Sequence, residues 1–377
     1  MRFIHTSDWH LGRILDQFHL TEDQAHVLDQ LATLAKDEKA EAFLISGDIY
    51  DRAVPPPEAV ELLDDFVSRV TLDLKIPIIV IAGNHDSRER LGFGAKILQH
   101  GRLYMFGTAL PKTPYVDLED AHGKVRFYCL PYAEPAEWRE VLSEETIRDH
   151  NAGYQRYVCD IQSAHPNGMR SVLLTHCFAT GAEKSDSERP LMIGGGGLVD
   201  SRLFDFFDYT ALGHLHKPQR IGKARYPGSI LKYSTSEAGH EKSICVVEMD
   251  KAGICKVDER KFFPRRDLRV VEGLFDDICK NSPSEDYVHV ILRDKQPVLD
   301  AAGRLRRVYQ NLLGIERPEE RLGASRVRAA EMAKMNEDDL FQLFFEQVSG
   351  EKPDDSIIGV FKDAVAIVRR RDEEALS

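Results

Sequence analysis

Five short polar motifs carry the side chains of this sequence that are best suited to chemistry. They are Asp8-Trp9-His10, Gly47-Asp48-Ile49-Tyr50-Asp51-Arg52, Gly83-Asn84-His85-Asp86, Thr175-His176 and Gly213-His214-Leu215-His216. Carboxylate and imidazole groups together suit manganese, iron or zinc. None of the motifs contains a cysteine, which argues against a structural zinc site. Seven side chains of ligand type are too many for one ion, and they suit two ions that share a carboxylate.

Each motif follows an apolar run that predicts a short buried strand. These runs cover residues 1–6, 43–45, 76–82, 171–175 and 209–212. Helical spacing of apolar residues predicts helices over 22–38 and from Pro55 onward, so strands and helices alternate as in an α/β protein. In open α/β sheets, ligands bind beyond the carboxyl ends of the strands. We therefore expect the strands to deliver their Asp, Asn and His side chains to one rim.

Two pairs of candidate ligands are spaced so that both members can face the same way. Asp8 and His10 are two positions apart, as are His214 and His216, which gives a common direction in extended backbone. Taken alone, each histidine would more often be an ordinary core or surface residue, Asp8 a cap, and Asn84 a turn residue. Those alternatives do not explain why five motifs stand at the same place after a strand. We therefore expect a two-metal site.

Composition and charge fit a globular protein that does not hold nucleic acid by bulk charge. The chain has 377 residues, of which 42% are hydrophobic and 30% charged, and its formal net charge is −12. A protein that binds DNA by overall charge would be basic, so contact with DNA would need local patches, bound cations or a partner. No apolar run has the 18 or so residues of a membrane span. The six cysteines lie far apart, as expected of reduced thiols in the cytoplasm.

The second part of the chain predicts a small appendage and a helical end. Residues 288–292 predict a strand and residues 297–313 a helix, so we expect a small α/β domain over 268–325. Residues 337–348 and 355–371 predict two short helices with wide apolar faces. Such helices ordinarily pack on their own domain, but here they could dock into a groove of a partner. The side chains with that role would be Leu340, Phe344, Ile358, Phe361 and Val365.

The ordered motifs resemble those of a known family. Asp-x-His, Gly-Asp-x-x-Asp-Arg, Gly-Asn-His-Asp, His and Gly-His-x-His are similar to the motifs of the calcineurin-like metallophosphoesterases. The stretches HTSDWHLGR, GDIYDRAVPPPEAVELL and DYTALGHLHKPQ…YPGSILKYSTSEAGHEKS resemble the SbcD family, the nuclease subunits of bacterial SbcCD exonucleases. This likeness covers nearly all of residues 1–270 and is weaker beyond. It implies an α/β two-sheet sandwich flanked by helices, with a nuclease core over 1–267, a cap over 268–325 and a helical partner-docking tail over 326–377.

The resemblance also implies how the metal ligands are shared. One ion would be held by Asp8, His10, Asp48 and His216. The other would be held by Asp48, Asn84, His176 and His214, with Asp48 bridging. The metal that the resemblance implies is manganese. Two such ions would activate a water for in-line attack on phosphorus and neutralise charge that develops on the phosphate oxygens.

Other polar residues near the motifs have two possible roles. We expect His85, which is not needed as a ligand, to stabilise the transition state and protonate the leaving sugar oxygen. The alternative is a structural histidine paired with Asp86. Asp51 and Arg52 are expected to form a structural pair behind Asp48. Three basic residues downstream of the last motif either contact DNA phosphates or lie on a solvated face: Lys217, Arg220 and Arg225.

Together these features predict a manganese-dependent DNA nuclease that acts as a double-strand exonuclease and a single-strand and hairpin endonuclease. Its expected setting is DNA repair, recombination and replication, and its expected partners are DNA and an SbcC-like coiled-coil ATPase. The resemblance implies a homodimer within a heterotetramer, away from membranes. One alternative is a phosphodiesterase or phosphatase for small phosphate esters, which the metal motifs alone do not separate from a nuclease. Another is a scaffold that tethers an ATPase to DNA, although every ligand position is filled.

Overall fold

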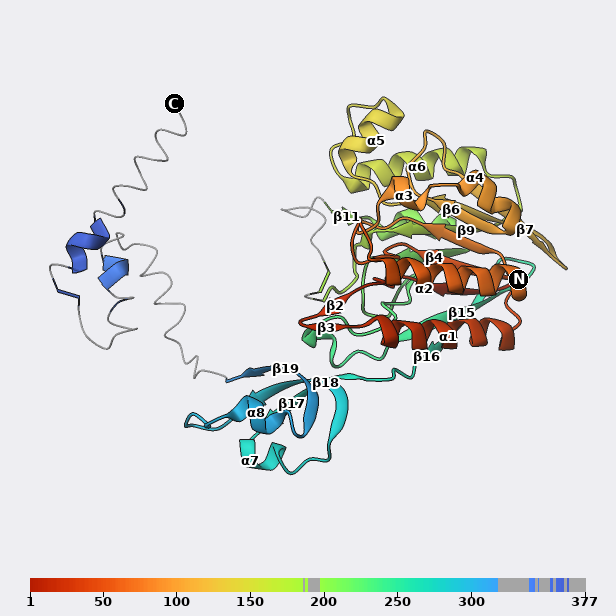
Figure 1. Cartoon of the computed structure of the whole chain (residues 1–377). Helices are drawn as coiled ribbons and strands as arrows, with labels where there is room; N and C mark the ends of the chain where they lie inside the picture. The colour runs from red at the N-terminus through yellow and green to blue at the C-terminus, as the bar shows by residue number, and fades with distance from the viewer. Residues whose placement is uncertain are drawn as a thin grey trace. The chain divides into compact units, whose positions relative to one another are not determined.

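The computed structural model describes residues 1–185, 187–188, 197–317, 339–342, 345, 353–354, 357–362 and 365. The chain divides into two units, residues 1–316 and residues 317–377. The first unit consists of layers of helices and sheets, followed by a separate small sheet (Figure 1). Among the described residues, no helix is both long enough and apolar enough to span a membrane.

Sheet one has six strands in the order β16-β15-β1-β4-β5-β6. Their bounds are β1 Arg2–Thr6, β4 Ala42–Ser46, β5 Ile78–Ile81, β6 Leu103–Phe106, β15 Ser243–Met249 and β16 Cys255–Lys261. Strands β1, β4, β5 and β6 are parallel, whereas β15 and β16 are antiparallel to their neighbours. Because side chains alternate along a strand, Phe43 and Ile45 pack in the cluster of the flanking helices, while Ala42 and Leu44 pack between the sheets.

Sheet two also has six strands, in the order β13-β14-β12-β9-β8-β7. Their bounds are β7 Tyr115–Asp120, β8 Gly123–Leu130, β9 Arg170–His176, β12 Tyr209–Gly213, β13 Gln219–Ile221 and β14 Ala224–Tyr226. The central strands are parallel and the two edge strands are antiparallel. An apolar layer joins the two sheets, and in it the ring of Phe3 lies 5.8 Å from that of Phe127 and 5.5 Å from that of Tyr209.

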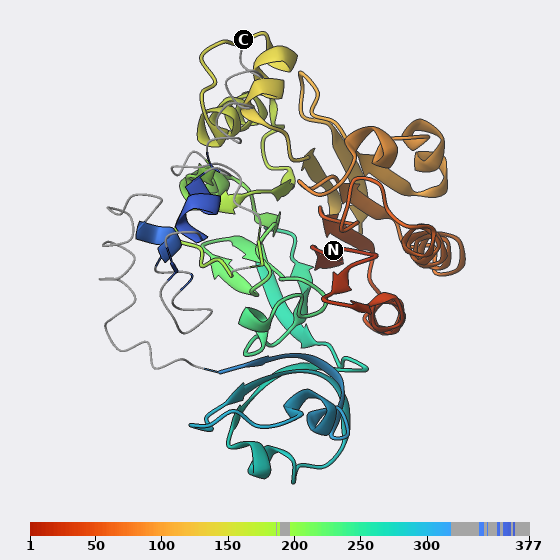
Figure 2. The same ribbon diagram turned by 60° about the vertical axis from the view of Figure 1, so that its left-hand side comes forward.

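Helices cover the outer face of each sheet, as Figures 1 and 2 show from two sides. Helices α1 (Thr21–Asp37) and α2 (Pro57–Ser68) pack on sheet one, and α5 (Pro135–Leu142) and α6 (His150–Ala164) pack on sheet two. The two-sheet α/β sandwich flanked by helices is therefore confirmed. The shorter elements of this unit are β2 Ile14–Leu15, β3 Phe18–His19, η1 Arg69–Asp73, α3 Arg88–Leu91, α4 Ala95–Leu98, η2 Gln99–Gly101, β10 Phe178–Ala179, β11 Leu198–Val199, η4 Ser201–Phe206 and η5 Thr235–Glu237.

The cap is a three-stranded parallel sheet with two short helices. Its elements are β17 Leu268–Gly273, α7 Phe275–Ile278, β18 Ser284–Leu292, α8 Ala301–Leu305 and β19 Tyr309–Glu316. The helix predicted over 297–313 is wrong beyond α8, because β19 pairs with β18 and buries Tyr309 and Leu312 in the cap's own core. A short apolar run fits either state, and tertiary pairing decided this one. The domain boundaries at 267 and 325 stay predictions.

His5 is a buried polar side chain between the two sheets. Its Nδ1 lies 2.9 Å from the hydroxyl of Tyr209, and its Nε2 lies 3.1 Å from Oγ of Ser46. The side chain is fully buried, and this burial lowers its pKa from 6.5 to about 3. His5 therefore stays neutral in the folded protein at pH values where an unfolded histidine takes up a proton.

This difference predicts that His5 makes folding sensitive to mild acid. Below a pH of about 6.5 only the unfolded chain protonates this residue, so its contribution to stability falls as the pH drops toward 3. Between pH 7.5 and 5.5, wild type should lose about 1.4 kcal/mol more unfolding free energy than His5→Gln. Chemical denaturation at the two pH values measures this difference, and an equal loss in both proteins would contradict it.

Candidate metal centre

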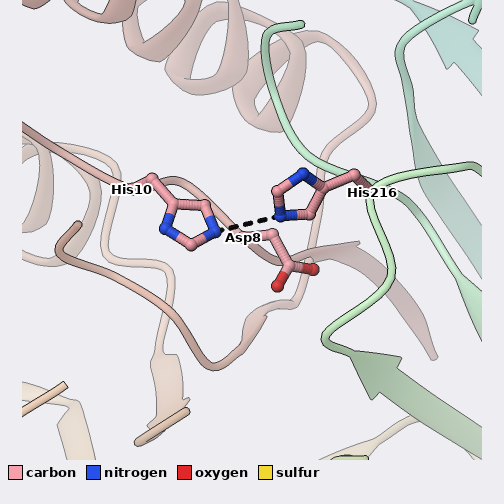
Figure 3. Close-up of side chains that lie close together, drawn as sticks. All are labelled: Asp8, His10 and His216. Carbon is pink, nitrogen blue, oxygen red and sulfur yellow. Dashed lines mark hydrogen bonds between the residues drawn. The ribbon is translucent and has the colours of Figure 1, made fainter. Parts of the chain in front are cut away.

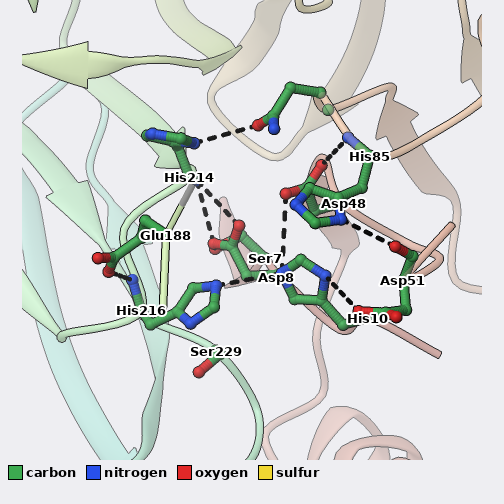
Figure 4. A network of polar contacts seen from close by, with 12 residues as sticks. Ser7, Asp8, His10, Asp48, Asp51, His85, Glu188, His214, His216 and Ser229 are labelled. Atoms are coloured by element: carbon green, nitrogen blue, oxygen red, sulfur yellow. Dashed lines mark hydrogen bonds and ion pairs between the residues drawn. The ribbon is translucent and has the colours of Figure 1, made fainter. Parts of the chain in front are cut away.

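The five polar motifs lie together at the carboxyl ends of strands from both sheets, and Figure 4 shows residues of four of them. Strands β1, β4 and β5 of sheet one and strands β9 and β12 of sheet two lead into them. The structure therefore brings all the sequence-predicted ligand residues into one site. Six of them are buried and Asn84 is half-buried: Asp8, His10, Asp48, His176, His214 and His216 are the buried ones.

Asp8, His10 and His216 form one corner of the site (Figure 3). Nε2 of His10 lies 3.1 Å from Nε2 of His216, and a ligand atom of each of the three residues lies within 4.8 Å of the others. Burial lowers the pKa of His10 well below its ordinary value, so its imidazole is neutral. Two nitrogens bound to one ion at a right angle would be about 3 Å apart, given bonds of about 2.1 Å. This corner fits a divalent cation.

A second corner is built from Asp48, Asn84, His176 and His214. Oδ1 of Asn84 lies 3.0 Å from Nε2 of His176 and 3.1 Å from Nδ1 of His214. Oδ2 of Asp48 lies 3.5 Å from Nε2 of His176 and 3.7 Å from Nε2 of His10 in the first corner. Asp48 thus reaches both corners, as a carboxylate shared by two ions would. The oxygen and nitrogen atoms here are ligands that manganese, iron and zinc accept.

Burial and charge shift the pKa values of these groups in different directions. Burial raises the pKa of Asp8 to about 6. Burial alone would also raise the pKa of Asp48, but the neighbouring His176 brings it well below its ordinary value. Burial alone would lower the pKa of His176, but Asp48, together with Asp8 and the carbonyl of Ser46, raises it to about 9. A cation bound to His176 would replace the proton on this imidazole, so metal binding should release protons.

Four of the ligand residues have backbone conformations that side-chain-bearing residues rarely adopt. The φ angles are 53° at Asp8, 45° at His10, 51° at Asp48 and 105° at His214. Each such conformation costs on the order of 1–3 kcal/mol and persists only where its surroundings enforce it. Here the loops enforce it on each other: the N–H of Asp8 donates to Gly47 O at 3.0 Å, and that of His10 donates to Asp48 O at 3.0 Å.

Two glycines let the loops approach closely enough to form the site. A Cβ on Gly83 would lie 2.2 Å from Oδ1 of Asp48, and one on Gly213 would lie 1.8 Å from the carbonyl oxygen of Ser46. That carbonyl is also the acceptor, at 2.9 Å, for Nδ1 of His176. Because Nδ1 donates there, the neutral ring of His176 has its lone pair on Nε2, which faces the second corner.

His85 is held beside the ligands by two hydrogen bonds. Its Nδ1 donates to the carbonyl oxygen of Asp51 at 2.8 Å, and its backbone N–H donates to Oδ1 of Asp48 at 2.8 Å. The carboxylate of Asp51 accepts a hydrogen bond of 2.7 Å from Arg13 and lies 3.7 Å from Nδ1 of His10. Asp51 therefore orients His85 through its backbone and approaches His10 through its side chain.

Asp86 does not take part in the alternative pairing with His85, and Arg52 lies differently from its expected position. The side chain of Asp86 does not pair with His85 among the described contacts; it joins two loops by accepting N–H bonds of 3.1, 3.0 and 2.9 Å from Ile49, Tyr50 and Gly83. The side chain of Arg52 is 67% exposed, and its Nε lies 3.7 Å from Asp51. Arg52 is thus at the surface rather than behind Asp48.

Gln24 and Tyr233 also support the site, although neither belongs to the five polar motifs. Nε2 of Gln24 donates to the carbonyl oxygens of Trp9 and His10 at 3.2 and 2.8 Å. The ring of Tyr233 lies edge-on to those of His10 and His216, with centroids 5.4 and 5.9 Å away. An amide on the buried face of the helix predicted over 22–38 was the one available signal for Gln24.

Glu237 and Lys242 are a second pair that the sequence did not single out. Oε1 of Glu237 lies 3.0 Å from Nδ1 of His216, and Nζ of Lys242 lies 2.5 Å from Oε2 of Glu237. Both side chains are buried. In the sequence they belong to a polar stretch typical of a solvated surface, and only their burial reveals the contact.

The predicted DNA-contact and docking residues are placed as follows. Lys217 pairs with Glu183, Arg225 lies 2.9 Å from Glu259, and the side chain of Arg220 donates to a nearby carbonyl. In the second unit the described docking residues are half-buried: Leu340, Ile358, Phe361 and Val365. Phe344 lies outside the described residues.

Two family models match the sequence. Residues 1–218 match the calcineurin-like phosphoesterase model, and these residues contain every predicted ligand. Residues 264–349 match the model named SbcD_C, described as the type 5 capsule protein repressor C-terminal domain. The first match covers more than half of the chain, and the second begins close to the predicted start of the cap.

Several solved structures match this chain at low sequence identity and low TM-score. A Staphylococcus aureus protein provisionally named a 5′-nucleotidase has a TM-score of 0.38 at 14% identity, with 70% of this chain and 54% of that one covered. The Plasmodium inner-membrane-complex anchor GAP50 has a TM-score of 0.43 at 12% identity, and the match covers 85% of this chain and 98% of that one. A Danio rerio dimetal phosphatase has a TM-score of 0.40 at 12% identity, and the match covers 69% of this chain and 96% of that one. This chain thus spans about half the length of the first of them.

The shared position of Asp48 predicts that its removal disrupts both corners. Asp48→Ala should abolish tight binding of two Mn²⁺ ions, because its carboxylate lies between the two sets of ligands. Arg52→Ala, in the same loop but exposed, is the matched control and should bind manganese as wild type does. Isothermal calorimetry measures both. Two wild-type sites in Asp48→Ala would contradict the bridging position.

Proposed function

The chain belongs to the calcineurin-like phosphoesterase family, and on that premise we propose that it is the DNA nuclease subunit of an SbcCD-like complex. The observation that carries the proposal is the order of the two matches: a phosphoesterase core with every ligand position filled is followed by an SbcD_C region. A core alone would suit phosphodiesterases and phosphatases of many kinds. The second region favours the nuclease over an enzyme for small phosphate esters.

The residues present fit a pair of divalent cations, and manganese is the metal we propose. Asp8, His10 and His216 would hold one ion, Asn84, His176 and His214 the other, and Asp48 both. When bound, such ions supply an activated water and charge neutralisation at the phosphate. The chain's own part is to fix the ligand atoms in advance, and the strained loops and close glycines serve this purpose.

His85 is the proposed proton donor to the leaving sugar oxygen. Its Nδ1–H is committed to the carbonyl of Asp51, so an imidazolium at this position would give up the proton on Nε2 and become the neutral Nδ1–H form. The backbone bond from His85 to Asp48 places this ring beside the shared carboxylate (Figure 4). A histidine held in this way can stabilise the transition state without acting as a ligand.

The proposed partners are DNA, an SbcC-like ATPase and a second copy of this chain, all in the cytoplasm. The sequence has no Gly-x-x-x-x-Gly-Lys-Ser/Thr nucleotide loop, so any dependence on ATP would come from another protein. In the second unit Phe341 stacks on Phe361 at 4.1 Å, and Val360 is 70% exposed, which supports an apolar docking surface. Apolar side chains around α2 and α4 support a homodimer: Val60, Leu72, Ile97 and Leu98 line an open groove there.

The function is tested by comparing substrates on the purified chain with manganese. Linear duplex and hairpin DNA should be cut, a chromogenic phosphodiester should be hydrolysed slowly, and phosphomonoesters should react least. Addition of the ATPase with ATP should stimulate cutting of duplex DNA only. A chain that lacks residues 317–377 should keep its diesterase activity and lose this stimulation, because those residues form a separate unit.

Other outcomes would point to the alternatives. Rapid hydrolysis of small phosphate esters, with the DNA left uncut, would indicate a small-molecule phosphoesterase instead of a nuclease. DNA and ATPase binding without hydrolysis of any ester would indicate a scaffold. Stimulation that survives removal of residues 317–377 would place the docking surface elsewhere on the chain.

The role of His85 predicts a loss of rate without a loss of metal. His85→Gln should bind two Mn²⁺ ions as wild type does and cut DNA about 10²–10⁴ times more slowly, the usual effect of losing an acid–base group. Calorimetry and a hairpin-cleavage assay on the same preparation separate the two effects. A full nuclease rate in the variant would leave His85 with a structural role.

A further inference from the structure

We propose that Glu237 and Lys242 form a positioning pair that fixes both the ring and the backbone of His216, and thereby joins the two sheets at the metal centre. The inference rests on the proposed metal site and concerns residues outside its five motifs. Glu237 is fully buried, and Lys242 is 8% exposed. Two opposite charges so far from solvent need a partner for every polar atom, and His216 provides two of those partners.

Glu237 determines which nitrogen of His216 carries the proton. Its Oε1 lies 3.0 Å from Nδ1 of His216, and its Oε2 accepts a hydrogen bond of 2.5 Å from Lys242. A carboxylate paired with an ammonium group only accepts hydrogen bonds, so Nδ1 must be the donor. The lone pair of His216 then lies on Nε2, the atom that faces His10 at 3.1 Å in the first corner. This is how carboxylates orient metal-binding histidines in general.

Lys242 holds the backbone of the same residue. Its three ammonium protons have three acceptors: Glu237 Oε2 at 2.5 Å, Ser229 Oγ at 2.7 Å and the carbonyl oxygen of His216 at 2.8 Å. The N–H of Ser229 donates to that carbonyl as well, at 3.2 Å. His216 is therefore held at two points, its ring by Glu237 and its main chain by Lys242.

The pair also connects ligands that come from different sheets. His216 follows β12 of sheet two, whereas Lys242 directly precedes β15 of sheet one. Strand β15 pairs with β1, and Asp8 and His10 follow β1. The contacts of Lys242 therefore set His216 of one sheet against Asp8 and His10 of the other. All three residues belong to one corner, so a displacement of Lys242 from His216 would separate them.

The substitution Glu237→Gln tests the proton placement directly. Lys242 still needs an acceptor, so the amide oxygen should turn to it, and the amide NH₂ should then face Nδ1 of His216. Nδ1 would have to accept, and the proton would move to Nε2. In ¹⁵N-histidine-labelled, metal-free full-length chain, His216 should show the Nδ1–H form in wild type and the Nε2–H form in Glu237→Gln, with His216→Gln assigning the signal.

Metal binding gives a second and independent readout. Because a proton on Nε2 blocks the ligand lone pair, one Mn²⁺ site of Glu237→Gln should weaken by about 10–100-fold, while the other stays close to wild type. Ser187→Ala is the matched control, since Ser187 Oγ lies 3.0 Å from the same Nδ1 but can donate or accept and so does not determine the tautomer. It should keep the Nδ1–H form.

A double variant separates positioning from simple stability. Glu237→Leu with Lys242→Met removes both buried charges, so it should fold as wild type does by its melting temperature. It leaves Nδ1 of His216 without the carboxylate acceptor, and one Mn²⁺ site should still weaken by about 10–100-fold. Wild-type manganese affinity in this variant, or an Nδ1–H form of His216 in Glu237→Gln, would overturn the proposal. If wild type bound no manganese, the metal site would fail, and the tautomer measurement would still decide the role of the pair.

Discussion

The burial of two carboxylates, Asp8 and Asp48, without a lysine or arginine beside them is the constraint on which the site depends. In the described parts of the chain, their hydrogen bonds and ion pairs involve backbone N–H groups, a serine hydroxyl and imidazoles, and no lysine or arginine. Removing such groups from water costs several kcal/mol each. The raised pKa of Asp8 is one expression of this cost. At His176 the charge of Asp48 raises the pKa although burial alone would lower it. A pair of bound divalent cations would balance the negative charge of these two carboxylates.

The same constraint explains why the surrounding backbone is strained and tightly tied. Ligand atoms can converge only if the loops turn sharply, and the positive φ angles of Asp8, His10 and Asp48 are the result. The three N–H bonds to Asp86 and the exchange of backbone bonds between the loops after β1 and β4 stabilise these turns. Rigidity obtained in this way places the ligands before any cation arrives.

The sequence predicted the parts of the structure that depend on local pattern. Short apolar runs followed by Asp, Asn or His identified the five strands that lead into the site, β1, β4 and β5 of sheet one and β9 and β12 of sheet two, and the residues at their carboxyl ends. It failed where tertiary pairing decides, as in β19, where a run that fits a helix becomes a parallel strand. Glu237 and Lys242 were missed for a related reason: charged residues in a polar stretch resemble surface, and only the packing of η5 and β15 around His216 buries them.

Helix α1 connects the metal site to the cap through two consecutive residues. Oδ2 of Asp23 accepts hydrogen bonds from the hydroxyl of Tyr287 in β18, at 2.8 Å, and from Arg266 at 3.1 Å. Gln24, the next residue, holds the carbonyl of His10. Successive helix positions point about 100° apart, so one helix can face the cap and the ligand loop at once. Asp23 is 1% exposed, and a shift of the cap away from α1 would leave its charge unpaired. The cap and the ligand loop are therefore both hydrogen-bonded to the same helix, although they are separate in the sequence.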